Sequence, residues 1–139
     1  MKLAVQDYPL SEKRADLIRT RTGKSLHEIT VAALKSGAAT MEDLRITKDA
    51  LLMQAEIATA AGRPRLGQNF ERAADMVDVP QDFLLKAYEL LRPGRAKSKA
   101  ELLDCAKVFR ESYKAERVAA FLEEAAEVYD RRGLFQFRY

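Results

Sequence analysis

Apolar positions recur with helical spacing, most clearly between Thr47 and Gly62. Thr47 can cap a first helical turn, Gly62 can adopt the left-handed backbone that ends a helix, and no Gly or Pro lies between them. At about 100° per residue the apolar side chains fall on two roughly opposite faces. These are Leu51, Leu52, Ala55, Ala58 and Thr59 on one face, and Met53, Ile57 and Ala60 on the other. A helix apolar on two sides is usually covered on both, which predicts a central core helix; the alternative is a second face that docks on another protein.

The helices predicted after Gly62 are separated by recognisable start and stop signals. Pro64 suits the first position of a helix, Pro80 starts the next one in the same way, and Pro93-Gly94 stops it. Ser98 and Glu101 have the spacing of a capping box. Beyond them the apolar phase slips near residues 112–115, which indicates two helices. The expected helices span 11–20, 47–61, 64–77, 80–91, 98–112 and 115–132.

Two stripes run along the helix predicted over 64–77. The stripe expected to face the core contains Leu66, Phe70, Ala73 and Val77. The second stripe, about a quarter-turn round, contains Arg65, Asn69, Arg72 and Met76. Long polar side chains at this spacing are typical of a solvated flank. Because no acid occurs from Gly62 to Asn69, the alternative is that the arginines pair with groups on a partner protein.

The first 45 residues are predicted to form only short helical turns, interrupted by turn and capping residues, with few apolar side chains to pack. Ser11 is expected to cap a short polar helix that runs to about Thr20, and one or two helical turns are expected over 25–35. Thr40 and Asp43 have capping-box spacing, which predicts a single turn around 41–44. With so few apolar side chains, we expect this segment to be stabilised by docking onto the helices that follow.

The overall composition is typical of an all-α protein with a single domain. The chain has 139 residues, of which 47% are hydrophobic and 32% charged, with 6 Gly and 4 Pro. We expect a compact multi-helix domain with a lightly structured N-terminal segment (1–45), a helical core (46–132) and a tail (133–139). No apolar run is long enough to cross a membrane and no signal-peptide pattern opens the chain, so the prediction is a cytoplasmic protein. A single cysteine, Cys105, agrees with that compartment.

The net charge of +3 is small but unevenly distributed. Four cations crowd a loop that has no acid of its own: Arg92, Arg95, Lys97 and Lys99. Such loops are usually solvated surface, and a nucleic-acid site would be better supported by interleaved aromatic residues or a larger excess of charge. A free-standing helical adaptor or nucleic-acid-binding protein is therefore kept only as the alternative function. The preferred prediction includes no nucleic acid among the partners.

Few residues offer catalytic or metal chemistry. His27 is the only histidine, and Cys105 lies between apolar neighbours on a predicted helix, where a buried, inert thiol is the usual outcome. One His and one Cys are too few for a metal site with nitrogen and sulfur ligands, and the chain has no Gly-rich phosphate loop. No catalytic, cofactor-binding or metal-binding residue is therefore expected on this chain.

Several segments nevertheless resemble one known family. They are Asp7-Tyr8-Pro9-Leu10, Met41-Glu42-Asp43-Leu44-Arg45-Ile46-Thr47, Gln54-Ala55-Glu56-Ile57-Ala58, Ala61-Gly62-Arg63-Pro64-Arg65-Leu66, Asn69-Phe70-Glu71-Arg72-Ala73-Ala74, Val79-Pro80, Leu91-Arg92-Pro93, Glu101-Leu102-Leu103, Ala119-Ala120-Phe121, Glu124-Ala125-Ala126 and Tyr129. These family-matching segments resemble the small subunit of adenosylcobalamin-dependent diol and glycerol dehydratases. The likeness covers roughly residues 7 to 132.

The resemblance implies a mostly helical small (gamma) subunit in a dimer of three-chain protomers. In that family the large subunit carries the barrel, the substrate pocket and its metal ion, and adenosylcobalamin lies between the large and medium subunits. The reaction is a radical dehydration of propanediol or glycerol to an aldehyde. This chain would brace the large subunit without sharing in the chemistry, which agrees with the lack of catalytic residues. The sequence of this chain does not predict whether propanediol or glycerol is preferred, because the resemblance places the substrate pocket on the large subunit.

The resemblance also implies a set of partner-binding residues. Tyr8 and Arg45 lie in the first two family-matching segments, and Arg65, Asn69 and Arg72 form the polar stripe; we expect these five to contact the other subunits.

The two ends of the chain depart from the family. Some members have a longer N-terminal extension associated with packaging into a protein-shelled microcompartment, whereas this chain starts almost at Asp7. Microcompartment association therefore stays an open alternative that no N-terminal extension supports. At the other end, Leu134–Tyr139 is aromatic where the family tends to be charged, and Phe135, Phe137 and Tyr139 alternate with polar residues. This end would be an exposed tail or an extra contact.

Overall fold

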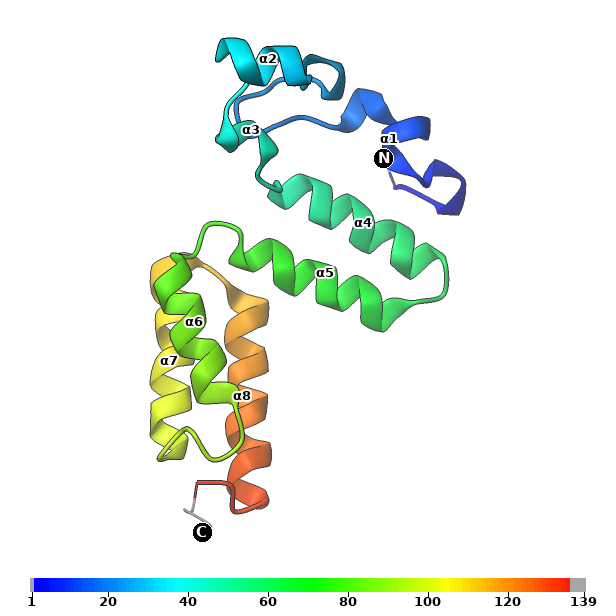
Figure 1. The fold of residues 1–139 in the computed structure, drawn as a ribbon. Helices are drawn as coiled ribbons and strands as arrows, with labels where there is room; N and C mark the ends of the chain where they lie inside the picture. The colour runs from blue at the N-terminus through cyan, green and yellow to red at the C-terminus, as the bar shows by residue number, and fades with distance from the viewer. Residues whose placement is uncertain (1, 136–139) are drawn as a thin grey trace. The chain divides into compact units, whose positions relative to one another are not determined.

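The structure is a computed structural model that describes residues 2–135. Its backbone contacts group the chain into two compact units, Met1–Val77 and Asp78–Tyr139. Every regular element in the described part of the chain is a helix, which confirms the predicted all-α fold (Figure 1). Whether the two units behave as the single domain expected from the sequence stays a prediction.

Short helical turns precede a helical hairpin in the first unit. In order, its elements are η1 (Val5–Asp7), α1 (Leu10–Lys13), η2 (Ala15–Leu17), η3 (Leu26–Glu28), α2 (Val31–Ser36), α3 (Met41–Leu44), α4 (Lys48–Ala60) and α5 (Pro64–Met76). The second unit contains α6 (Gln81–Leu91), α7 (Lys99–Tyr113) and α8 (Glu116–Arg131). Five of the six predicted helices therefore match to within about two residues at each end.

Local backbone chemistry sets the limits of α4, as the sequence predicted. The Thr47 hydroxyl accepts a hydrogen bond from the Ala50 N–H at 3.2 Å. At the other end Gly62 adopts a φ of 74°, and the Arg63 N–H donates to the Ala58 carbonyl at 2.9 Å. Together with the bond from the Gly62 N–H to the Thr59 carbonyl, this is a Schellman motif. The chain therefore reverses within a few residues and lays α5 beside α4 (Figure 1).

Helix α4 is covered on two sides by its own unit, which confirms the predicted central core helix. On one side α5 packs along it, and Leu51, Ala55 and Ala58 are buried. On the other side Ile57 forms a cluster with Leu3 and Leu10 from the N-terminal segment. Three half-buried side chains pack against this cluster: Leu17, Ile18 and Met53.

The prediction of which face of α5 is buried is wrong, because the helix is rotated about its axis relative to the expected orientation. The residues that α5 buries most deeply are Gly67, Ala74 and Asp75, whereas Leu66 is 38% exposed and Phe70 is half-buried. The cause is the missing side chain at position 67. A Cβ added there would overlap the Thr59 hydroxyl and lie 3.0 Å from the Ala55 carbonyl oxygen. Helix α5 therefore turns its glycine towards α4, and its larger apolar side chains move to the flank.

The helix predicted over 11–20 is also wrong. Helix α1 is only one turn long, Pro9 rather than Ser11 is its N-cap, and Arg14 leaves helical angles with φ −139° and ψ 42°. A segment this polar buries little by staying helical. Breaking the helix lets the Arg14 guanidinium pair with Asp16 at 3.2 Å and with Asp7 at 3.5 Å.

Acidic side chains close the short turns of the N-terminal segment. In each of η1, η3 and α3, the third residue is an acid whose carboxylate accepts the backbone N–H of the residue before the turn. The pairs are Asp7 with Ala4 at 2.8 Å, Glu28 with Ser25 at 2.7 Å, and Asp43 with Thr40 at 2.9 Å. We call these the acid-capped turns. The third confirms the single turn predicted at 41–44.

Asp43 also ties α3 to the loop that precedes η3. Its side chain is fully buried, and its Oδ1 accepts hydrogen bonds from the hydroxyls of Thr20, at 2.8 Å, and of Thr22. Lys24 Nζ lies 3.2 Å from Oδ2. These donors, led by Thr22, hold the pKa of the Asp43 carboxyl well below its ordinary value. A buried carboxylate thus organises a region that has few apolar contacts.

The second unit is a three-helix arrangement with an apolar centre. Helices α7 and α8 pack side by side (Figure 1), and the break between them falls within the predicted interval, at Lys114 with a φ of 55°. Phe109 is buried, with its ring 4.8 Å from that of Phe83 on α6. The Tyr129 hydroxyl of α8 donates to the Leu91 carbonyl at the end of α6. Both neighbours of α6 therefore hold it in place.

The capping box predicted at the start of α7 is only half formed. Ser98 Oγ accepts the Glu101 N–H at 3.3 Å, but the Glu101 carboxylate accepts the Lys97 N–H instead of that of Ser98. At the C-terminus, Phe135 lies with its ring 6.2 Å from that of Tyr129. The rest of the predicted alternating tail, residues 136–139, lies outside the described residues.

Candidate partner-docking cleft

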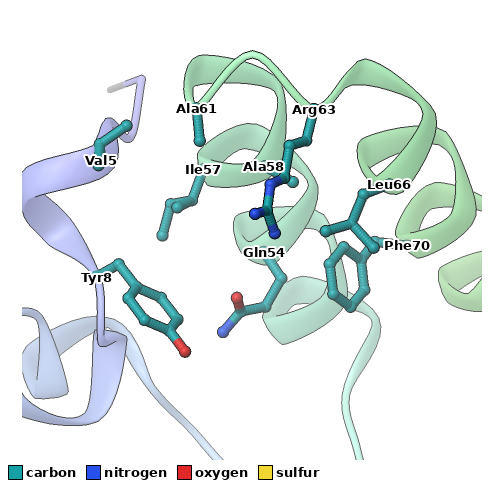
Figure 2. Close-up of a pocket in the computed structure, with 9 residues that line it drawn as sticks. All are labelled: Val5, Tyr8, Gln54, Ile57, Ala58, Ala61, Arg63, Leu66 and Phe70. Carbon is teal, nitrogen blue, oxygen red and sulfur yellow. The ribbon is translucent and has the colours of Figure 1, made fainter.

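A cleft of about 450 Å³ opens within the first unit, between the N-terminal segment and the α4–α5 hairpin. Figure 2 shows the nine lining side chains, which come from η1, Tyr8, α4, the turn after it and α5. They are Val5, Tyr8, Gln54, Ile57, Ala58, Ala61, Arg63, Leu66 and Phe70. We call this the N-terminal cleft.

Apolar side chains, some buried and some exposed, form most of this cleft. Ile57 and Ala58 are buried in α4, while Leu66 and Phe70 come from the flank of α5 that the close helix contact turned outward. On the opposite side, Val5 is 52% exposed and Tyr8 is 59% exposed. This side of the cleft therefore leaves apolar side chains open to solvent.

Three polar groups border the apolar surface. The Tyr8 hydroxyl and the Gln54 amide extend towards one another, and the Arg63 guanidinium lies nearby, between Ala58 and Leu66 in the view of Figure 2. Within residues 2–135 none of these three side chains makes a hydrogen bond or ion pair. All three can donate hydrogen bonds. The cleft thus presents donors at its edge and hydrocarbon beneath them.

The structure brings together only some of the residues that the sequence nominated for partner binding. Tyr8 lines the cleft, whereas Arg45 follows α3 and pairs with Glu42 at 3.5 Å. On α5, the Arg72 guanidinium donates to the side-chain amide oxygen (Oδ1) of Asn69, while Arg65 is exposed. The contact with Asn69 means that Arg72 is already engaged inside its own helix.

Sequence reasoning missed the cleft because it assigned Leu66 and Phe70 to the core. It likewise gave no role to Gln54 or Arg63, although both lie in family-matching segments. The signal that could have revealed the cleft was Gly67, because a glycine in the middle of a helix often marks close approach of another backbone.

The residues that could carry other chemistry are placed unfavourably for it. Cys105 is buried in α7, and burial raises the pKa of its thiol, which confirms the predicted buried cysteine. His27 is exposed on η3. Among residues 2–135 no group of three or more His, Cys, Asp or Glu side chains is arranged to hold a metal ion. No helix in this part of the chain is both long and apolar enough to span a membrane.

The basic loop of the second unit is largely neutralised by neighbouring helices. Arg92 and Arg95 both pair with Glu89, at 3.1 and 3.3 Å, and Lys99 pairs with Glu127 at 2.7 Å. The loop has no acid of its own, yet α6 and α8 supply them. Locally compensated cations make a weak footprint for nucleic acid, which needs unpaired positive charge to displace counterions.

Comparisons with known proteins all find similarity to dehydratase small subunits. A family model described as dehydratase small subunit matches residues 3–136. A propanediol dehydratase small subunit from Citrobacter freundii is 44% identical over 128 residues, covering 92% of this chain and 74% of that protein. The propanediol dehydratase small subunit of Salmonella typhimurium shows the same identity over the same length, with 73% of that protein covered.

Proposed function

Because the chain belongs to the dehydratase small-subunit family, we propose that it braces the large catalytic subunit of a cobalamin-dependent diol dehydratase. As a small subunit of a diol dehydratase it associates with other dehydratase subunits. Our proposal is that these are a large and a medium subunit, assembled as a dimer of three-chain protomers. The complete enzyme would convert vicinal diols, such as propanediol or glycerol, into aldehydes.

This chain's own residues do not fit a cobalamin site. The one cleft described above is apolar with three hydrogen-bond donors at its edge, and His27 lies outside it. We therefore assign adenosylcobalamin and the radical chemistry to the other subunits, and to this chain only binding and support.

The observation that carries the proposal is the position of the N-terminal cleft on the family-matching segments. All of its lining residues except Val5 lie in those segments. The cleft also exposes large apolar side chains that a folded subunit would otherwise bury, as expected of a surface that becomes the centre of an interface. We propose that the cleft and the neighbouring polar stripe of Arg65, Asn69 and Arg72 contact the large subunit. Tyr8 belongs to the cleft itself, and Arg45 is proposed as a further contact outside it.

Co-purification of a tagged chain with co-expressed large and medium subunits tests the proposal. We expect all three to elute together with diol dehydratase activity, and the isolated chain to bind no adenosylcobalamin and dehydrate no diol. Stoichiometric binding of the cofactor by the isolated chain would contradict the assignment of roles. Salt-sensitive binding of DNA or RNA, without the other subunits, would favour the adaptor or nucleic-acid alternative.

The polar stripe is tested by replacing Arg65 and Arg72 together with Glu. We expect an unchanged helical circular dichroism spectrum and weakened co-purification, at a cost of about 2–5 kcal/mol if the arginines are buried in the interface. The matched control replaces Lys35 and Lys48 with Glu, which makes the same change in charge at exposed sites elsewhere in the unit. Wild-type yield and salt tolerance for the arginine variant would place the docking face elsewhere.

A further inference from the structure

The N-terminal cleft has a charge pattern that identifies the chemistry of its occupant. Arg63 brings a positive charge to the edge of the cleft, and the stretch from Gly62 to Asn69 contains no acid. The nearby acids are engaged elsewhere, since Glu56 accepts the Leu3 N–H at 2.9 Å and Asp7 accepts the Ala4 N–H at 2.8 Å. Among the described residues of its unit, Arg63 therefore makes no ion pair.

The neighbouring donors extend this pattern. The Tyr8 hydroxyl and the Gln54 amide line the same cleft as Arg63 (Figure 2). A guanidinium group offers a planar fork that matches a carboxylate, and a carboxylate can accept further hydrogen bonds from a hydroxyl and an amide. The apolar surface beneath these donors, formed by Leu66 and Phe70, suits a large aliphatic or aromatic side chain.

We propose that the cleft receives a segment of another dehydratase subunit that presents an Asp or Glu carboxylate to Arg63 and a large apolar side chain to Leu66 and Phe70. The inference rests on the proposed function and specifies the chemistry of the contact. The charge pattern favours an acidic partner segment, because Arg63 is the charged side chain among the lining residues and the Tyr8 hydroxyl and Gln54 amide can donate beside it. The apolar surface favours a protein segment over a small anion, which would leave that surface exposed to water.

Quantitative binding of the wild-type chain to the purified complex of the remaining subunits, compared with single variants, tests the charge. We expect Arg63→Glu to raise the Kd by on the order of 30-fold or more, and to remove much of its dependence on salt. Tyr8→Phe, which keeps the ring and removes the hydroxyl, should raise the Kd less. The matched control is Lys48→Glu, because Lys48 lies at the far end of α4 from the cleft, and it should bind like wild type.

Photo-crosslinking identifies the occupant. A benzoylphenylalanine at position 8 places the reactive group in the cleft, and after irradiation of the assembled enzyme the joined peptide is sequenced. We expect a peptide of another dehydratase subunit that contains Asp or Glu beside a large apolar residue. A crosslink to a second copy of this chain, or to a segment without an acid, overturns the inference.

The binding measurements distinguish a wrong function from a wrong occupant of the cleft. If the wild-type chain binds no dehydratase subunit, the proposed function is wrong and the inference falls with it. If the wild-type chain binds and Arg63→Glu binds within about twofold of it, the proposed function stands and the inference about the cleft is wrong.

Discussion

Replacing Gly67 with Ala should destabilise the protein, although Ala is the better helix former. On an isolated helix the substitution would stabilise by about 1 kcal/mol. In this structure a Cβ at position 67 would overlap the Thr59 hydroxyl and lie 3.0 Å from the Ala55 carbonyl oxygen. Thr59 can change rotamer, but the carbonyl is part of the α4 backbone and moves only if the two helices separate.

The two effects can be weighed against each other. Overpacking a close contact typically costs about 1–3 kcal/mol. Subtracting the gain in helix propensity leaves a net loss of about 1 kcal/mol in the free energy of unfolding. For a chain of this size that corresponds to a fall in Tm of about 4 °C. Thermal and urea unfolding followed by circular dichroism measure the change.

A control separates packing from propensity. Gln68→Ala lies next in α5 at an exposed position and should alter stability by only a few tenths of a kcal/mol, as roughly expected of a surface change. Combining Gly67→Ala with Thr59→Ala should recover part of the loss, because it removes the hydroxyl but leaves the carbonyl. If Gly67→Ala raises Tm as propensity alone predicts, the close approach of α4 and α5 is not what positions this glycine.

Three further predictions follow from individual side chains. The pKa of the Asp43 carboxyl is lowered chiefly by the Thr22 hydroxyl. The ionised carboxylate therefore stabilises the fold above the unfolded pKa of about 3.9, and this stabilisation is lost as the pH falls through the folded pKa. The difference in Tm between wild type and Asp43→Asn should accordingly be largest near neutral pH and become smaller in acid. Tyr129→Phe removes the donor to the Leu91 carbonyl and should lower the free energy of unfolding by about 1 kcal/mol in urea titrations. Cys105, buried and with a raised thiol pKa, should react with a thiol reagent far more slowly in the native protein than in denaturant, and equal rates would contradict its burial.

The elements predicted well from the sequence are those whose limits are set within a few residues. Thr47 and Gly62 bound α4 through hydrogen bonds to adjacent backbone groups, so their effect does not depend on the rest of the fold. Pro64 at the start of α5 acts in the same local way. The one predicted helix that did not form, over 11–20, had few apolar side chains to sustain it.

What the sequence could not reveal is which way a helix turns towards its neighbour. Leu66 and Phe70 have the spacing of a core face, and only the neighbouring backbone of α4 shows that Gly67 occupies that place. The cleft follows from this rotation and was hidden for the same reason. Its polar edge was equally invisible, because Tyr8, Gln54 and Arg63 are brought together by tertiary packing alone.

The acid-capped turns have a consequence for how this chain tolerates mutation. In a helical hairpin such as α4–α5, the apolar positions are the sensitive ones, because their loss leaves a cavity. Each acid-capped turn instead depends on one carboxylate that holds the backbone amide three residues before it. In a saturation mutagenesis library Asp7, Glu28 and Asp43 should therefore be as intolerant as the buried Leu3 and Leu10. Exposed apolar residues such as Val31 should be permissive except where a partner covers them.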